Sequence, residues 1–337
     1  MRVFSGLTAA AVGSLLLAMP GLAATGLAAT AHPDRHDGDR AAIGRPSTYR
    51  LTGDPVDAGG SKFEGIGVDR RTGTFYVSEV TGGEIHRGRL DDEQAQEWLA
   101  GDGTDGRWTA RGITTDRHGR VYVAGGPNGI DHRGAPDLWV YDRSGRLLSA
   151  LSVETADAFV NDVTIGPDGA AYLTNSNDPQ VFRLAEEDGR WQVDTFVDAT
   201  GTIERRQGFN LGGIVVSPDR EALVVAQGNT GRLWRVDLDS REVSALDTGD
   251  AGLVNADGLV RRGHTLWVVR NFSRRLTTLG LDHEARSARL VDDRATDPDR
   301  VLTTAKLAGG RLLAVDSHFD EATGRPPYEV VTLQVRR

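Results

Sequence analysis

Six similar stretches recur along the chain, and each begins at a residue in an equivalent position. These residues are Glu64, Arg111, Asn161, Gly212, Asp257 and Thr303. Two carboxylates and one carboxamide are an unusual set to place at the start of otherwise apolar strands. Their oxygen atoms are the ligands that Ca²⁺ prefers, and this ion takes about six to eight of them with water filling the gaps. If the six side chains face one point, they predict a divalent-cation site.

The stretches share one pattern, in which an apolar strand is followed by a tight turn and by a second strand rich in Tyr, Trp, Val and Leu. The first residues of successive copies are separated by 47, 50, 51, 45 and 46 residues. This period is typical of a four-stranded propeller blade. Turn residues such as Gly169 and Gly310 supply the positive φ angles that hairpins need. The repeat therefore predicts an all-β, six-bladed β-propeller whose innermost strands line a central channel.

The two ends of the repeat region predict how the ring closes. The sixth copy runs out of chain after its third strand, at residues 328–335, whereas residues 47–53 precede the first copy and have strand character. We expect this N-terminal segment to supply the outer strand of the last blade, which protects the sheet edges. The propeller domain then covers residues 47–337. A seven-bladed ring and a β-sandwich are the alternatives, but six repeats without long gaps favour six blades.

Residues 1–31 have the features of a secretory signal peptide. Arg2 supplies a positive charge, an apolar run extends to Leu27, and a small-x-small sequence ends at Ala31. A membrane anchor is the alternative, but Gly and Pro residues interrupt the run and no basic cluster follows directly. We expect cleavage near His32, a flexible leader over residues 32–46, and a secreted, bacterial-type exported protein that leaves the membrane.

Composition excludes several classes of function. The chain has 48 acidic and 39 basic residues, a formal net charge of −9 and no cysteine. The negative charge repels phosphate backbones, which argues against a nucleic-acid partner. The lack of cysteine excludes disulfides, thiolate nucleophiles and Cys-ligated zinc. There is no G-x-S-x-G sequence of a Ser-His-Asp esterase, and none of the six equivalent residues is a histidine.

Three short motifs carry a resemblance to a known family. Glu-Gly at Glu64, Asn-Asp at Asn161 and Asp-Gly at Asp257 occur once per blade in this order. They are similar to the motifs of the senescence-marker-protein/gluconolactonase/luciferin-regenerating-enzyme-like family. The resemblance implies six blades, a channel metal held by a Glu, an Asn and an Asp, and hydrolysis of sugar lactones. It implies that Glu64 and Asp257 bind the metal, that Asp257 is also the general base, and that Asn161 is a second, substrate-side Asn.

The sequence departs from that pattern at two positions. The family's ligand Asn falls on Gly212, which offers only a backbone carbonyl, and Asn210 is a candidate replacement if the strand is bulged there. A substrate-binding Arg of several members is replaced by Phe159. We expect the cation to be Ca²⁺, with Zn²⁺, Mg²⁺ or Mn²⁺ as alternatives. The expected metal ligands are Glu64, Asp257, Asn161 and Asn210.

The predicted function is a divalent-metal-dependent hydrolase of a lactone or small ester. The metal would polarise the carbonyl and lower the pKa of a water molecule, and Asp257 would take the proton. Asn161 would orient the small-molecule substrate, and Arg111 would stabilise the oxyanion or bind a substrate carboxylate. Alternatively, Arg111 forms an ion pair with Glu64 or Asp257 and fills the metal position. The rival function is a non-catalytic propeller that binds a small ligand, a glycan or a protein partner.

Overall fold

The computed structural model of the chain describes residues 45–54, 59–126 and 134–335. The predicted signal peptide and most of the predicted leader lie outside these residues. Every regular element of the described residues is a β-strand, and no helix among them could span a membrane. The described strands are, in chain order, β1 (Thr48–Leu51), β2 (Phe63–Asp69), β3 (Thr74–Glu79), β4 (Ile85–Arg89), β5 (Gln94–Leu99), β6 (Ala110–Thr115), β7 (Val121–Gly125), β8 (Leu138–Tyr141), β9 (Leu147–Leu151), β10 (Val160–Ile165), β11 (Ala171–Asn175), β12 (Gln180–Glu187), β13 (Arg190–Asp198), β14 (Leu211–Val216), β15 (Ala222–Gln227), β16 (Arg232–Asp237), β17 (Val243–Leu246), β18 (Ala256–Arg262), β19 (Thr265–Arg270), β20 (Arg275–Leu281), β21 (Ala288–Ala295), β22 (Leu302–Ala308), β23 (Arg311–Asp316) and β24 (Glu329–Gln334).

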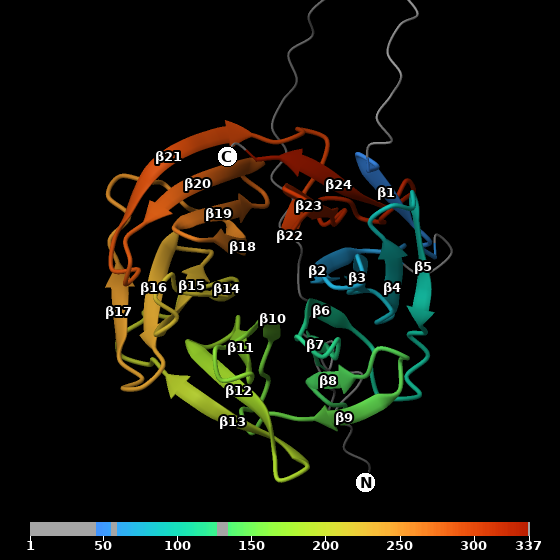
Figure 1. The fold of residues 1–337 in the computed structure, drawn as a ribbon, viewed down its shortest axis with the longest axis horizontal. Coiled ribbons are helices and arrows are strands. Elements are labelled where there is room, and N and C mark those ends of the chain that lie inside the picture. Colours follow the sequence, from blue (N-terminus) through green and yellow to red (C-terminus); the bar gives the residue numbers. More distant parts are fainter. Residues whose placement is uncertain (1–44, 55–58, 127–133, 336–337) are drawn as a thin grey trace, which may run out of the picture. The chain divides into compact units, whose positions relative to one another are not determined.

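These strands surround a central axis in a propeller arrangement (Figure 1). Within the described residues, β6–β9, β10–β13, β14–β17 and β18–β21 each form a four-stranded sheet in chain order. A further sheet of eight strands has the order β2-β3-β4-β5-β1-β24-β23-β22. The innermost strands contact one another in a closed circuit, from β2 through β6, β10, β14, β18 and β22 back to β2. The all-β propeller predicted from the repeat is therefore confirmed.

The N-terminal strand β1 lies between the first and last parts of the ring. It pairs antiparallel with β24, where Tyr49 is opposite Val330, and it pairs in parallel with β5 over two residue pairs. The Tyr49 hydroxyl also donates a hydrogen bond of 3.0 Å to the carbonyl of Leu90. This is the position next to the last strand that the sequence predicts for the N-terminal segment. The edge of β24 is thereby covered, as a closed ring requires.

Each innermost strand carries an irregularity at the residues that the repeat singles out. In β2, Phe63 pairs with Glu79 and Ile66 pairs with Val77, so that Glu64 and Gly65 together stand opposite a single residue of β3. The same register shift occurs in β6, β10, β14, β18 and β22. A bulge of this kind bends a strand and changes the direction of its side chains. At the bulge, the side chains of the site residues therefore do not follow the regular alternation between the two faces of the sheet.

Glycine at the second bulge position lets neighbouring innermost strands approach closely. A Cβ atom at Gly65 would lie 2.1 Å from the carbonyl oxygen of Arg111, and one at Gly213 would lie 2.3 Å from that of Asp257. Real Cβ atoms do not tolerate such distances. By contrast, a Cβ atom at Gly212 would have no neighbour closer than 3.5 Å. The second position is thus restricted by backbone contact, whereas the first is open to a side chain.

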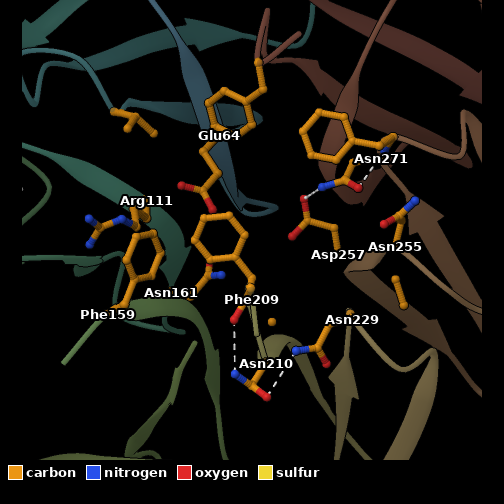
Figure 2. Close-up of a pocket in the computed structure, with 17 residues that line it drawn as sticks. Glu64, Arg111, Phe159, Asn161, Phe209, Asn210, Asn229, Asn255, Asp257 and Asn271 are labelled. Carbon is orange, nitrogen blue, oxygen red and sulfur yellow. Dashed lines mark hydrogen bonds between the residues drawn. The ribbon is translucent and has the colours of Figure 1, made fainter. Parts of the chain in front are cut away.

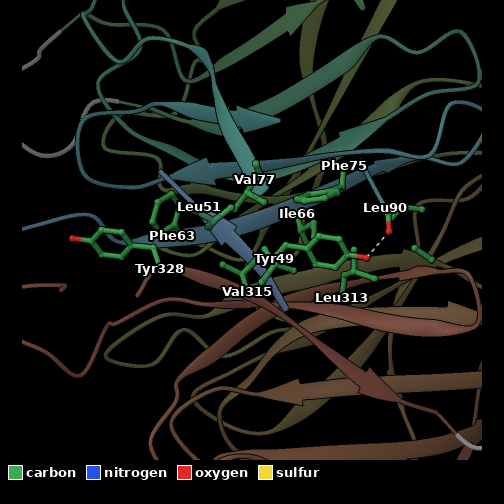
Figure 3. Packing of buried hydrophobic residues seen from close by; sticks show 13 residues of the cluster. Tyr49, Leu51, Phe63, Ile66, Phe75, Val77, Leu90, Leu313, Val315 and Tyr328 are labelled. Atoms are coloured by element: carbon green, nitrogen blue, oxygen red, sulfur yellow. Dashed lines mark hydrogen bonds between the residues drawn. The ribbon is translucent and has the colours of Figure 1, made fainter. Parts of the chain in front are cut away.

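Apolar side chains fill the spaces between adjacent sheets of the ring. One cluster joins β1–β4 to β22–β24, and we call it the closing seam (Figure 3). Rings of Phe63, Tyr49 and Phe75 are fully buried there. Tyr49 and Phe75 meet edge to face with their centroids 4.9 Å apart. Complete burial of one such side chain stabilises the fold by about 1.5–3 kcal/mol. The closing seam consists of Tyr49, Leu51, Phe63, Ile66, Phe75, Val77, Leu90, Ala95, Ala308, Leu313, Val315, Tyr328 and Val330.

Candidate functional site

A cavity of about 510 Å³ lies at the centre of the ring (Figure 2). Of the six equivalent residues predicted from the repeat, all except Thr303 line it. The Thr303 hydroxyl instead donates a 2.9 Å hydrogen bond to the backbone carbonyl of Glu64. Five of the six positions that the repeat singles out therefore line the cavity. The cavity is lined by Glu64, Val80, Arg111, Phe159, Asn161, Gly208, Phe209, Asn210, Gly212, Gly228, Asn229, Asn255, Ala256, Asp257, Asn271, Phe272 and Phe319.

Two carboxylates dominate the chemistry of the cavity. Glu64 is buried, and its carboxylate makes no hydrogen bond with any described residue. Burial, together with the charges of Asp257 and Asp162, raises its pKa to about 8, although Arg111 opposes this shift. Burial and the charge of Asp162 also raise the pKa of Asp257 to about 7, against a hydrogen bond that lowers it. Carboxylates held in this way gain from a cation placed between them.

A third acidic residue, Asp162, was not predicted as part of the site. It occupies the second bulge position of β10, where β2, β6, β14 and β18 carry glycine. Its buried carboxylate accepts hydrogen bonds from the backbone N–H groups of Val163 at 2.8 Å and Ile214 at 3.2 Å. It therefore joins β10 to β14 and adds negative charge beside Glu64 and Asp257. The Asn-Asp dipeptide was visible in the sequence, but only the structure shows that the charge of Asp162, which does not line the cavity, raises the pKa of Glu64 and of Asp257.

Asn271 is a second residue of the site whose role the sequence did not reveal. It follows β19 in a turn, and its side-chain Nδ2 donates a 2.7 Å hydrogen bond to Oδ2 of Asp257. Its own Oδ1 accepts a 2.6 Å hydrogen bond from the N–H of Phe272. These two contacts fix the amide and thereby fix the Asp257 carboxylate (Figure 2). Asn271 lies outside the six equivalent positions of the repeat, so the spacing does not single it out.

The structure places Asn161 in the cavity with a defined orientation. Its Nδ2 donates a 2.7 Å hydrogen bond to the Ser176 hydroxyl, which in turn donates to the carbonyl of Leu211 at 2.6 Å. This chain of hydrogen bonds holds the amide nitrogen against β14. The amide oxygen has no hydrogen-bond donor among the described residues, so it is available to a cation or a substrate.

Arg111 lies at the cavity wall and does not form the alternative ion pair. Within the described residues, no salt bridge joins it to Glu64 or Asp257 (Figure 2). Its Nη1 donates to the backbone carbonyls of Gly125 and Val160, and its guanidinium carbon lies 3.6 Å from the centre of the Phe159 ring. Burial lowers its pKa to about 10, which leaves it charged at neutral pH. The position between the two carboxylates is therefore not filled by this side chain.

Asn210 lines the cavity, and the register of β14 is shifted next to it as expected. Its side chain is, however, fully engaged with the protein. The Oδ1 atom accepts hydrogen bonds from the Arg206 N–H at 2.8 Å and from the Asn229 amide at 3.1 Å. The Nδ2 atom donates to the carbonyls of Ser176 and Gly208. A cation at Asn210 would have to displace these donors, so its role as a ligand stays a prediction.

The donor set fits a hard divalent cation in part. No group of three or more His, Asp or Glu side chains within the described residues could hold a metal ion. Glu64 and Asp257 supply two carboxylates, and the free oxygen of Asn161 supplies a third donor. Gly212 also lines the cavity but has no side-chain oxygen to offer as a fourth donor. Ca²⁺ accepts mixed carboxylate, amide and water ligands of this kind. Glu64, Asp257 and Asn161 are therefore the residues that would hold a cation.

Comparison with known proteins supports the same family as the motifs. The sequence profile of the SMP-30/Gluconolactonase/LRE-like region matches residues 63–270, which is more than half of the chain. No curated protein sequence matches the chain. The matched region begins at β2 and ends at β19, so it contains every candidate ligand.

Solved structures share the fold at low sequence identity. The major allergen Mala s 1 of Malassezia sympodialis is 18% identical with a TM-score of 0.63, over 86% of this chain and 96% of that protein. A calcium-binding regucalcin of Agrobacterium tumefaciens is 17% identical with a TM-score of 0.57, over 82% and 92%. A gluconolactonase of Xanthomonas campestris is 17% identical with a TM-score of 0.56, over 81% and 86%. At such identities the likeness shows the fold alone.

Proposed function

The chain belongs to the SMP-30/gluconolactonase/LRE-like family, and we propose that it is a divalent-cation-dependent hydrolase of a lactone or small ester. The observation that carries the proposal is the pair Glu64 and Asp257. These carboxylates come from different innermost strands, β2 and β18, and line one cavity, where the charge of Asp257 contributes to the raised pKa of Glu64. Structure alone gives no reason to bury two such groups together, because an uncompensated buried charge is costly. A bound cation removes that cost.

The residues of the cavity divide the reaction between them. A divalent cation, when bound, supplies polarisation of the lactone carbonyl and a lower pKa for water. Asp257 accepts the proton of the attacking water, as a positioned carboxylate within hydrogen-bond reach can do. Asn271 holds the Asp257 carboxylate in position through its 2.7 Å hydrogen bond. The free amide oxygen of Asn161 orients the substrate, and Arg111 supplies positive charge at the wall for a developing oxyanion.

A binding function without turnover is the second candidate. Gly212 leaves the set one side-chain donor short of the family pattern, which favours a propeller that holds a ligand in its channel. Regucalcin and gluconolactonase, the structural relatives described above, are respectively called a calcium-binding protein and an enzyme. The two functions differ only in whether Asp257 removes a proton from water. A hydrolysis assay separates them.

The proposal includes six blades and export. The eight-stranded sheet divides at the short contact between β1 and β5 into two groups of four strands, which gives six groups around the axis with the four other sheets. Export follows from the signal-peptide features of residues 1–31. Mass spectrometry of protein recovered from the culture medium tests it, and a mature N-terminus near His32 is the expected result.

The function is tested by returning cations to protein treated with EDTA. Ca²⁺, Mg²⁺, Mn²⁺ and Zn²⁺ are added separately, and the melting temperature and the hydrolysis of a lactone panel are measured. We expect one ion to raise the melting temperature and to support hydrolysis. Asp257→Asn should abolish both effects. Asp194→Asn, which changes an exposed carboxylate on β13, is the matched control and should retain both.

The outcomes separate the candidates. A cation-dependent rise in melting temperature without hydrolysis of any lactone or ester would favour the binding function. No response to any of the four ions would overturn the metal-dependent proposal. Hydrolysis that survives Asp257→Asn would show that another group is the base.

A further inference from the structure

The amide N–H groups at the rim of the cavity already donate hydrogen bonds within the protein. Asn229 Nδ2 donates to Asn210 Oδ1 at 3.1 Å, and Asn255 Nδ2 donates to the Ser273 hydroxyl at 3.0 Å. Asn271 donates to Asp257 as described above. Recognition of a polyhydroxylated ligand needs free, well-placed donors and acceptors. The amide N–H groups of this rim instead hold the loops and the catalytic carboxylate, and Asn229 Oδ1, which has no partner among the described residues, can only accept a hydrogen bond.

Phenyl rings make up the surface that the amides leave open. Phe159 lies on the Arg111 guanidinium at 3.6 Å, and the ring of Phe209 lies 5.2 Å from that of Phe159 (Figure 2). Phe272 and Phe319 also line the cavity. Arg111, Phe159 and Phe209 therefore form one stacked wall, from the buried guanidinium outwards to solvent.

This wall continues into exposed apolar side chains at the mouth. Phe209 is 60% exposed and Phe272 is 45% exposed, although large aromatic residues are usually well buried. Val254, next to the rim residue Asn255, is 47% exposed. The packing of the fold does not require these positions to be apolar, because they contact little of the core. An apolar group entering the cavity would cover them.

We infer that this site takes a neutral lactone or ester whose substituent is an apolar chain or ring, in preference to a polyhydroxylated sugar lactone. The inference rests on the proposed function and adds its substrate class. The ester group would lie near Glu64 and Asp257, and the apolar substituent would lie against Phe159 and Phe209. A cavity of about 510 Å³ accommodates a ligand of this size. Phe159, which replaces the Arg of several family members, is then a specificity residue.

The test compares two lactones with the same six-membered ring, δ-decalactone and glucono-δ-lactone. We expect kcat/KM to be at least about tenfold higher for δ-decalactone, since a few methylene groups in an apolar site give discrimination of this order. Phe209→Ala should reduce this preference ratio about tenfold, and Phe209→Leu should restore most of it. Leu290→Ala removes an exposed apolar side chain from the outer strand β21 and should leave the ratio unchanged.

Binding of the same two lactones to Asp257→Asn, measured by calorimetry, separates this inference from the proposed function. Tighter binding of δ-decalactone without any hydrolysis by the wild type would retain the substrate class and reject the hydrolase. Efficient hydrolysis with a preference for glucono-δ-lactone would retain the hydrolase and overturn the substrate class. A preference for δ-decalactone that Phe209→Ala leaves intact would also overturn it, because the phenyl wall would then have no part in selection.

Discussion

Two neighbouring residues of β2, Phe63 and Glu64, belong to regions of opposite character. Phe63 is fully buried in the closing seam, where aromatic and aliphatic side chains pack without charge. Glu64 is almost as buried, yet its carboxylate has no hydrogen-bond partner among the described residues and its pKa is raised to about 8. Burial alone therefore does not describe either region. What differs is whether the protein itself satisfies the buried group.

This difference shows where the fold is stabilised and where it is strained. The closing seam gains free energy from every apolar contact that it makes. The channel loses free energy by holding Glu64, Asp257 and Asp162 together, unless a ligand compensates. Active sites commonly concentrate such unfavourable groups, because the same features give them reactivity. Substitutions in the two regions should accordingly change stability in opposite directions.

The largest expected effect is the loss of a ring from the closing seam. Phe63→Ala should lower the free energy of unfolding by about 3–5 kcal/mol, because it leaves a cavity between the first and last strands of the ring, at the closing seam. Chemical denaturation of the purified protein measures this change. Phe63→Leu is the control and should cost much less. A loss below about 1 kcal/mol for Phe63→Ala would mean that the seam does not hold the ring closed.

The opposite effect is expected in the channel, at Glu64. In the metal-free protein its pKa is raised from 4.5 to about 8, so the folded state binds a proton that the unfolded state releases. Stability from this group is fully present below about pH 4.5 and is lost as the pH rises to 8, with a total of about 4 kcal/mol. Melting temperatures of wild type and Glu64→Gln, measured in EDTA from pH 5 to pH 8, should therefore diverge. Parallel curves would contradict the buried-carboxylate interpretation.

A smaller effect should follow from completing the donor set. Gly212 is at the open first bulge position, so Gly212→Asn adds an amide oxygen without a backbone clash. We expect about tenfold tighter cation binding, measured by calorimetry, since one further oxygen donor replaces a water ligand. Gly213→Ala is the contrasting variant. Its Cβ would lie 2.3 Å from the carbonyl of Asp257, and it should destabilise the protein instead. Unchanged affinity in Gly212→Asn would place the cation away from β14.

The sequence predicted the repeat, the closure and the residues that begin each blade, because these depend on local alternation and on regular spacing. The period of the six stretches is enough to place Glu64, Asn161 and Asp257 at one level of a channel. The pairing of β1 with β24 follows from the need to cover a sheet edge, and it is confirmed. These features can be predicted without any knowledge of side-chain contacts.

The remaining parts of the site could not be predicted in this way. Asp162 acts on the site through its charge from the second bulge position of β10, and this position is not one of the six that the repeat singles out. Asn271 reaches Asp257 from a turn, where spacing carries no information about direction. Asn210 was expected to be a metal ligand. Its side-chain oxygen instead accepts a hydrogen bond from Arg206, in a loop that the repeat does not define. Irregular backbone is therefore the limit of the sequence argument.

The smallest effect that we expect concerns the hydrogen bond from Asn271 to Asp257. This bond lowers the pKa of Asp257, so Asn271→Ala should raise it. A base must be deprotonated to act, and the acid limb of the pH profile of kcat should therefore move to higher pH, by roughly half a unit to one unit. We expect kcat at neutral pH to fall about fivefold. KM should change less, because Asn271 holds the base and not the substrate.

The pH profile distinguishes positioning of the base from a general disturbance of the rim. Asn255→Ala is the matched control, because its amide lies in the same cavity but donates to Ser273 and not to Asp257. It should leave the midpoint of the acid limb where the wild type has it. If Asn271→Ala lowers kcat equally at every pH, its amide affects the loop and not the ionisation of Asp257. A shift confined to Asn271→Ala would show that one neutral side chain sets the pKa of the buried Asp257 carboxylate. The closing seam has no charged side chain and therefore no group that could be tuned in this way.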